Sequence, residues 1–315
     1  MWACMPILTP TWVISVLFVL AFIFIPLGIL FFLADFFVVE SSIQYNANCP
    51  VTSTNCEMKL RVDEDMKAPV YFYYKLVWYF QNHRRYVKSR DDSQLQGQVT
   101  TRSWMDPTQT VPKSYSDYST CRPQISEDDS RDTDKIYYPC GLIAASVFND
   151  TFELKSSSNN TIAWRKNPAK VNVAGVEVWS PGIAWPSDVY FKFKNLDDPP
   201  GIVIVPKVQD EDFVVWMRPA ALPIFRKLYR IIDEDLKKGE YTVVIDSHYD
   251  VSDWGGQKWA VLSTTSFLGG KNPFLGVAYL VTGGICLFLG TIFLVLQLVR
   301  PRKFGDPSYL RWDVA

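Results

Sequence analysis

The sequence has little of the chemistry on which enzymes and metal sites depend. Its 315 residues include two histidines, His83 and His248, which lie far apart in the chain and have no nucleophile nearby. The hydrolase motif G-x-S-x-G, the zinc motif H-E-x-x-H, the Walker phosphate loop and the dinucleotide motif G-x-G-x-x-G are missing. These absences argue against enzymatic function, and we expect no catalytic residue, no cofactor and no metal.

Acidic clusters occur at residues 210–212 and 233–235, and each raises the question of a glycosidase or calcium site. Adjacent residues on a strand or a helix point in different directions, so neither run forms a convergent carboxylate pair by itself. We therefore expect both acidic runs to be solvated surface.

Two long apolar stretches are the strongest feature that the sequence does contain. Residues 11–33 and 274–299 carry no charge, and both are longer than the roughly 20 residues that span a bilayer. The first stretch differs from a cleaved signal peptide because its apolar core is too long and no small-residue cleavage pattern follows it. The sequence thus predicts a membrane protein with two transmembrane helices.

The positive charges that follow the second stretch predict its orientation. Arg300, Arg302 and Lys303 come directly after it, and such residues favour the cytoplasmic side. We expect a short cytoplasmic segment at residues 1–10, a lumenal or extracellular domain at 34–273, and a cytoplasmic tail at 300–315.

Cysteines and glycosylation motifs fit a lumenal or extracellular domain. Of the six cysteines, Cys4 and Cys286 lie beside or inside a predicted span. The loop holds Cys49, Cys56, Cys121 and Cys140, which allow three disulfide pairings. The sequence-local pairing, Cys49 with Cys56 and Cys121 with Cys140, closes the shortest loops and costs the least closure entropy.

Zinc is the alternative reading of these cysteines, but the spacing lacks C-x-x-C and the histidines are scattered. The N-x-[ST] motif occurs twice, at Asn149 and Asn159, and predicts N-linked glycans.

Local patterns predict a β-rich domain with one long helix. Residues 70–81 alternate apolar and polar side chains, as a strand does, and shorter strand patterns follow at 200–208, 241–251 and 258–267. Apolar residues at helical spacing, with Gly239 as a stop signal, predict a helix within residues 218–240. Residues 91–135 and 155–200 are expected to form long loops.

The segment 73–90 interleaves aromatic rings with cations, a pattern that also holds single-stranded nucleic acid. A lumenal position argues against nucleic acid as the partner, and two interpretations remain. The segment is either a solvated basic turn beside a core strand or a surface that binds a partner protein. The residues that carry the second reading are Arg84, Arg85, Tyr86, Lys88 and Arg90.

A glycine stripe marks the second apolar stretch. Gly276, Gly283 and Gly290 recur every seven residues, which places them on one helix face where another helix can approach closely. The stripe contacts either a partner in the membrane or the first apolar stretch of the same chain.

Several sequence blocks resemble the accessory beta subunits of phospholipid flippases, also known as the cell-division-control-fifty, ligand-effect-modulator or ALA-interacting-subunit family. The resemblance runs in family order from Pro6 to Pro301. Its blocks are PILTP, FIFIPLG, QNHRRYVKSRDDSQL, PCGLIAASVFNDTFEL, EDFVVWMRPAALPIFRKLYR and LSTTSFLGGKNPFLGVAYL.

The resemblance implies two transmembrane helices and a lumenal, mainly antiparallel β ectodomain with disulfides, an α+β fold. It also implies a non-catalytic subunit that pairs with a lipid-translocating P-type ATPase in the membrane and enables its folding, its export from the endoplasmic reticulum and its transport of aminophospholipids or other phospholipids. Endoplasmic reticulum, Golgi, endosomal and plasma membranes are the expected locations.

By matching motif, the two local cysteine pairs look like the family's two lumenal disulfides, and Asn149 looks like a family glycan site. The alternative from another class is a two-span ligand-gated channel subunit. Such channels need a polar pore lining, whereas Thr282 and Gln297 are the main hydrogen-bonding side chains of the second stretch.

Overall fold

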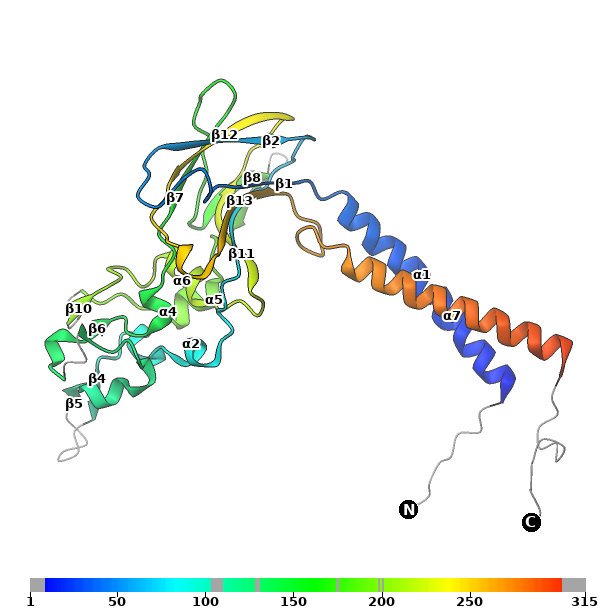
Figure 1. Cartoon of the computed structure of the whole chain (residues 1–315), viewed down its shortest axis with the longest axis horizontal. Coiled ribbons are helices and arrows are strands. Elements are labelled where there is room, and N and C mark those ends of the chain that lie inside the picture. The colour runs from blue at the N-terminus through cyan, green and yellow to red at the C-terminus, as the bar shows by residue number, and fades with distance from the viewer. Residues whose placement is uncertain are drawn as a thin grey trace, which may run out of the picture. The chain divides into compact units, whose positions relative to one another are not determined.

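The computed structural model describes residues 9–102, 110–127, 131–173, 176–197, 199 and 201–301, which form two compact units (Figure 1). The helical unit contains Met1–Val39 and Thr265–Ala315, and the β unit contains Glu40–Thr264. Cys4 and the tail beyond residue 301 lie outside the described residues.

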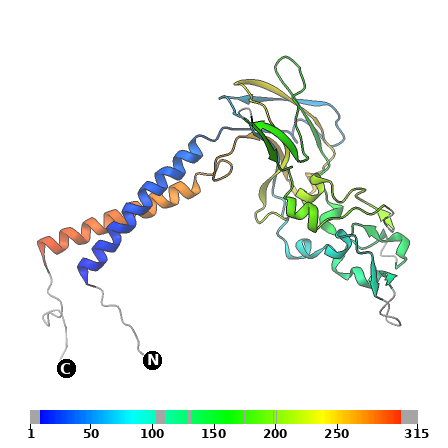
Figure 2. The same ribbon diagram turned by 180° about the vertical axis from the view of Figure 1, so that it is seen from behind.

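The helical unit consists of α1, Pro10–Phe36, and α7, Phe274–Val299, which lie side by side (Figures 1 and 2). Both are long and apolar enough to cross a membrane. At about 1.5 Å per residue each helix is roughly 40 Å long. The predicted pair of long apolar helices is confirmed.

The glycine stripe of α7 packs against α1. A Cβ atom added to Gly276 would lie 2.9 Å from the Cα of Phe32, and one added to Gly290 would lie 3.4 Å from the Cβ of Leu17. The two helices are therefore antiparallel, and the helix that packs against the stripe is α1 of the same chain. A matching seven-residue stripe on α1 consists of Ile14, Ala21, Gly28 and Asp35, the buried residues of that helix.

We expect Gly276→Val to weaken the helix pair, because the new side chain would collide with the backbone of α1. Overpacking of this kind costs about 1–3 kcal/mol. The loss of stability is measured by unfolding the protein in SDS while energy transfer between dyes on α1 and α7 reports their separation. Gly284→Val is the matched control, since no described atom lies within 4 Å of a Cβ at that position. Equal losses in the two variants would contradict the close packing at Gly276.

The β unit is built on two antiparallel sheets. The larger has the order β1-β13-β3-β11, and the smaller has the order β2-β12-β7. The strands are β1 Glu40–Gln44, β2 Cys56–Val62, β3 Val70–Val77, β7 Thr151–Lys155, β11 Ile224–Ile232, β12 Gly239–Asp246 and β13 Gln257–Ser263. The prediction of a mainly antiparallel β domain is confirmed.

Aromatic rings form the core between the two sheets. The ring centre of Phe152 in β7 lies 5.2 Å from that of Phe72 in β3 and 5.1 Å from that of Tyr229 in β11. Along β3 the residues at even positions are buried and those at odd positions up to Lys75 are half-buried. This alternation confirms the predicted strand over Val70–Val77, but residues 78–81 lie outside it.

The prediction of a helix within residues 218–240 is wrong. This segment forms β11, a turn, and the start of β12, and β11 pairs with β3. The inward positions of β11 are Lys227, Tyr229 and Ile231. A buried lysine at one of these positions hides the alternation, so the remaining apolar residues match helical spacing by coincidence.

Short elements fill the stretches predicted as long loops and connect the two sheets. Of the strand pattern at 200–208, the structure describes residues 201–208, and within these only the two residues of β10 form a strand. The short strands are β4 Thr100–Arg102, β5 Thr110–Pro112, β6 Tyr137–Tyr138, β8 Ala169–Val173, β9 Val176–Ser180 and β10 Ile202–Val203. The short helices are α2 Arg84–Lys88, α3 Asp92–Leu95, η1 Tyr115–Cys121, η3 Thr133–Lys135, α4 Leu142–Ala145, α5 Pro186–Phe191, α6 Glu211–Met217 and η4 Ser252–Trp254.

Candidate functional site

The chain turns sharply where β3 ends and exposes two large aromatic rings. Trp78 has a φ of +65°, in the left-handed region that non-glycine residues rarely adopt. The side chains of Trp78 and Phe80 are 51% and 55% exposed, whereas the Tyr79 ring between them packs against Trp216 and Trp254. Exposed aromatic rings on a rigid base are typical of surfaces that bind partners.

These rings border an open groove with a volume of about 1270 Å³. Residues from four parts of the chain line this aromatic groove: the segment 78–88, the segment 119–123, Leu142 and Trp254. Among the lining residues that the structure describes, Arg85, Lys88 and Arg122 are cationic and none carries a carboxylate. The groove therefore combines apolar surface with positive charge.

The groove brings together three of the five residues of the segment 73–90 for which we expected a partner-binding role. Arg85, Tyr86 and Lys88 of α2 line it, while Arg84 and Arg90 do not. Within the part of the chain that the structure describes, neither Arg85 nor Lys88 forms a salt bridge, whereas Arg90 pairs with Asp92 at 2.9 Å. Arg85 and Lys88 are exposed, so their charges are available to a partner.

Tyr86 contributes its ring to the groove and its hydroxyl to the interior. The hydroxyl lies 2.8 Å from the Ser146 hydroxyl and accepts from the Tyr79 hydroxyl at 3.3 Å. Burial raises the pKa of Tyr86 well above its usual range, and the neighbouring Tyr79 adds to the shift. The side chain stays neutral at physiological pH and helps to hold α2 on the β unit.

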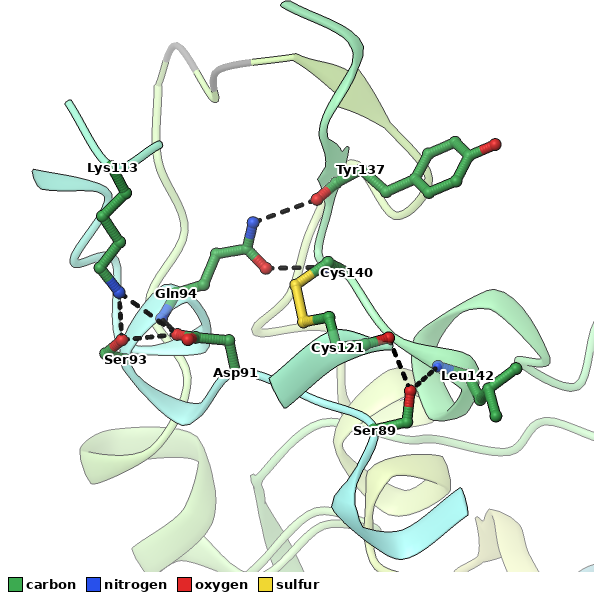
Figure 3. Close-up of a disulfide and its surroundings, with 9 residues drawn as sticks. All are labelled: Ser89, Asp91, Ser93, Gln94, Lys113, Cys121, Tyr137, Cys140 and Leu142. Atoms are coloured by element: carbon green, nitrogen blue, oxygen red, sulfur yellow. Dashed lines mark hydrogen bonds and ion pairs between the residues drawn. A yellow bond between two sulfur atoms is a disulfide. The ribbon is translucent and has the colours of Figure 1, made fainter. Parts of the chain in front are cut away.

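A disulfide fixes the C-terminal end of α2 (Figure 3). Cys121 is bonded to Cys140, and Ser89, the residue after α2, donates to the Cys121 carbonyl at 2.8 Å. The same Ser89 hydroxyl accepts from the Leu142 backbone at 2.9 Å. A Cβ at Gly141 would lie 2.2 Å from the Ser89 carbonyl oxygen, so only glycine fits there.

Gln94 makes a second link between α3 and this disulfide. Its side-chain oxygen accepts from the Cys140 backbone at 2.8 Å, and its side-chain nitrogen donates to the Tyr137 carbonyl at 3.1 Å (Figure 3). The disulfide and the residues that follow α2 therefore form one rigid support. Such preorganisation favours binding because little side-chain and loop freedom is lost on association.

The local sequence gives little indication of the groove residues outside the segment 73–90. Arg122 and Trp254 belong to segments far from α2 in the chain, and the disulfide and a tight turn at Gly255 hold those segments in place. The one signal in the sequence is a tryptophan within the polar, glycine-containing run at residues 252–256, and in the structure Trp254 is 39% exposed.

The sequence profile of the LEM3 (ligand-effect modulator 3) / CDC50 family matches residues 37–303. The chain belongs to this family. It is 41% identical to ALA-interacting subunit 3 of Arabidopsis thaliana, over 99% of this chain and 87% of that protein. It is 36% identical to cell cycle control protein 50A of Mus musculus, over 94% and 85% of the two chains.

A yeast member of the LEM3/CDC50 family is also similar. The chain is 34% identical to the phospholipid-transporting ATPase accessory subunit LEM3 of Saccharomyces cerevisiae, over 82% of this chain and 62% of that protein. Family membership and the two long apolar helices together make the chain an integral membrane protein.

The remaining candidate residues of this LEM3/CDC50 protein lie apart from the groove. Cys49 is bonded to Cys56, as in the sequence-local pairing. Asn149 and Asn159 are both exposed. Gly276, Gly283 and Gly290 lie in the helical unit, where they contact α1.

The expectation that residues 210–212 are solvated surface is wrong. Asp212 forms salt bridges with Lys166 at 3.1 Å and Arg230 at 2.7 Å, and Asp210 pairs with the same Lys166. Glu211 is buried and accepts a hydrogen bond from the backbone of Ala184. The run fixes the start of α6, and no group of metal-binding side chains occurs in the described part of the chain.

Proposed function

We propose that this chain is the non-catalytic accessory subunit of a phospholipid-transporting P-type ATPase. Family membership carries the proposal, together with the names of the relatives, which include a phospholipid-transporting ATPase accessory subunit and an ALA-interacting subunit. The partner is the catalytic subunit, and this chain contributes no catalytic residue. The ligand-gated channel alternative lacks this support.

The chain assists the ATPase before transport begins. It assembles with the ATPase in the endoplasmic reticulum, enables its folding and export, and stays bound while the ATPase moves aminophospholipids or other phospholipids in Golgi, endosomal or plasma membranes. The positive charges at Arg300, Arg302 and Lys303 support cytoplasmic termini and a lumenal or extracellular β unit.

The aromatic groove is the docking surface for the ATPase on the lumenal or extracellular side of the membrane. The described lining residues carry cations and no carboxylate, so the groove is complementary to an acidic segment of the partner. Such complementarity gives specificity and speeds association. The exposed rings of Trp78 and Phe80 provide apolar area at low entropic cost, because aromatic side chains have few rotatable bonds.

Coexpression with candidate phospholipid-transporting ATPases tests the proposal. Affinity capture of this chain should recover the ATPase, and without the chain the ATPase should remain in the endoplasmic reticulum and fluorescent-lipid uptake should be lost. Lipid uptake by the purified chain without any ATPase would overturn the accessory role.

Both N-x-[ST] motifs are proposed to carry glycans, because Asn149 and Asn159 are exposed and lie in the β unit. We expect glycosidase treatment to increase the electrophoretic mobility of the protein, and each single replacement, Asn149→Gln or Asn159→Gln, to remove part of that shift. The double variant should show no shift. A shift that persists in the double variant would place a glycan elsewhere, and no shift in the unaltered protein would contradict the lumenal orientation.

A further inference from the structure

A tight turn directly before α7 presents two apolar side chains to the surroundings. The backbone N–H of Ser266 donates to the Gly269 carbonyl at 2.8 Å, and the N–H of Gly269 donates to the Ser266 carbonyl at 2.9 Å. Phe267 and Leu268 form the tip and are 73% and 43% exposed. Two adjacent apolar residues at the tip of a turn are unusual, because turns favour small and polar residues.

The turn is fixed to the end of the helix pair where α1 ends and α7 begins. The Asn272 backbone donates to the carboxylate of Asp35, the residue before the last residue of α1. The Asn272 side chain in turn accepts from the backbone of Phe274, the first residue of α7, at 3.1 Å. Figure 1 shows the turn as the small loop that leads into α7.

The same end of the helix pair carries further exposed aromatic rings. Phe36 and Phe37 at the end of α1 are 72% and 74% exposed, and Phe274 is 73% exposed. A helix of about 40 Å exceeds a hydrocarbon core of about 30 Å, so the ends of a centred span reach the headgroup layer. These rings and the turn therefore lie at the depth where lipid headgroups meet acyl chains.

We propose that the turn at residues 266–269 is a membrane-interface anchor that inserts Phe267 and Leu268 into the headgroup and acyl boundary beside the helix pair. The occupant of this apolar surface is phospholipid, because the surface is continuous with two membrane-spanning helices. Lys271, the one charged residue between Thr265 and Pro273, is placed to meet lipid phosphates, as cations beside a membrane surface do.

Spin labelling of the full chain in phosphatidylcholine vesicles tests this anchor. The label is attached at Leu268→Cys in a background with Cys4→Ser and Cys286→Ser, and its collisions with oxygen and with a water-soluble nickel chelate are compared. Oxygen concentrates in the bilayer, so the ratio gives the depth of the label. Phe288→Cys on the exposed face of α7 is the lipid control, and Glu64→Cys in an exposed turn of the β unit is the water control.

We expect the label at position 268 to lie about 5–10 Å into the boundary region, the depth that interfacial apolar side chains reach. A label at position 268 that collides with nickel as often as the label at position 64 would overturn the proposal. Protection from both reagents would also overturn it, because protein would then cover the turn. The experiment needs no ATPase, so its failure leaves the proposed accessory function untouched.

Discussion

Lys258→Met is expected to destabilise the β unit by about 3–5 kcal/mol, the cost of breaking a buried ion pair by removing one partner. The ammonium group of Lys258 lies 2.7 Å from the Asp150 carboxylate, and their side chains are 1% and 0% exposed. The same ammonium donates to the Ser247 hydroxyl at 2.8 Å and to the Tyr249 carbonyl at 2.6 Å. Burial lowers the pKa of Lys258, and the Asp150 charge opposes this shift.

The loss is large because the remaining carboxylate is buried and serves several partners. Asp150 also accepts from the Tyr45 hydroxyl and from the backbone N–H groups of His248 and Tyr249, each at 2.6 Å. Lys258 belongs to β13 of the larger sheet, whereas Asp150 directly precedes β7 of the smaller sheet. The pair therefore joins the two sheets, and removing Lys258 leaves a charge without compensation in the interior.

The change in the free energy of unfolding is measured by chemical denaturation of the full chain, monitored through tryptophan fluorescence. Lys59→Met is the matched control, because the Lys59 and Glu240 side chains are 75% and 54% exposed and exposed pairs are worth about 0–1 kcal/mol. Asp150→Asn combined with Lys258→Met should cost less than the sum of the single variants, since the two residues interact directly. A loss for Lys258→Met no larger than that for Lys59→Met would show that the pair contributes little.

Sequence patterns predicted the elements whose burial follows a regular period. The two apolar helices carry long uncharged runs. In β3 the buried residues at even positions, Val70 to Leu76, alternate with the half-buried Tyr71, Tyr73 and Lys75. The same reasoning failed for β11, because Lys227 occupies an inward position. Its ammonium is buried and donates to the carbonyls of Val215 and Trp216 in α6 and of Arg218 directly after α6. These tertiary contacts satisfy the charged group and override the polar character of the side chain.

The candidate site was predictable only where its residues are close in sequence. Arg85 and Lys88 belong to one basic segment, whereas Arg122 and Trp254 reach the groove through contacts between distant parts of the chain. The glycine stripe left two interpretations open, because a row of small residues on one helix does not reveal which other helix packs against it. The matching stripe at Ala21 and Gly28 of α1 decides between them, but its residues are too varied to stand out in the sequence.

Arg85→Glu with Lys88→Glu is expected to weaken capture of the ATPase by tenfold or more. Close charge pairs across an interface contribute about 1.5–7 kcal/mol, and each 1.4 kcal/mol changes the dissociation constant about tenfold. Both side chains line the aromatic groove, so reversed charges would repel an acidic partner segment. Affinity capture of the coexpressed ATPase at several salt concentrations measures the loss, and the weakening should be greatest at low salt because salt screens exposed charges.

Single variants separate a docking role from a structural one. Arg84→Glu and Arg85→Glu make the same charge change at adjacent exposed positions of α2, but only Arg85 lines the groove. Docking through the groove requires Arg85→Glu to weaken capture while Arg84→Glu changes it little, with both variants retaining the melting temperature of the unaltered chain. If α2 is only a solvated turn beside β3, the folded fraction of every variant should bind the ATPase normally. A lower melting temperature with normal capture would therefore assign Arg85 to the stability of the β unit and move the docking surface elsewhere.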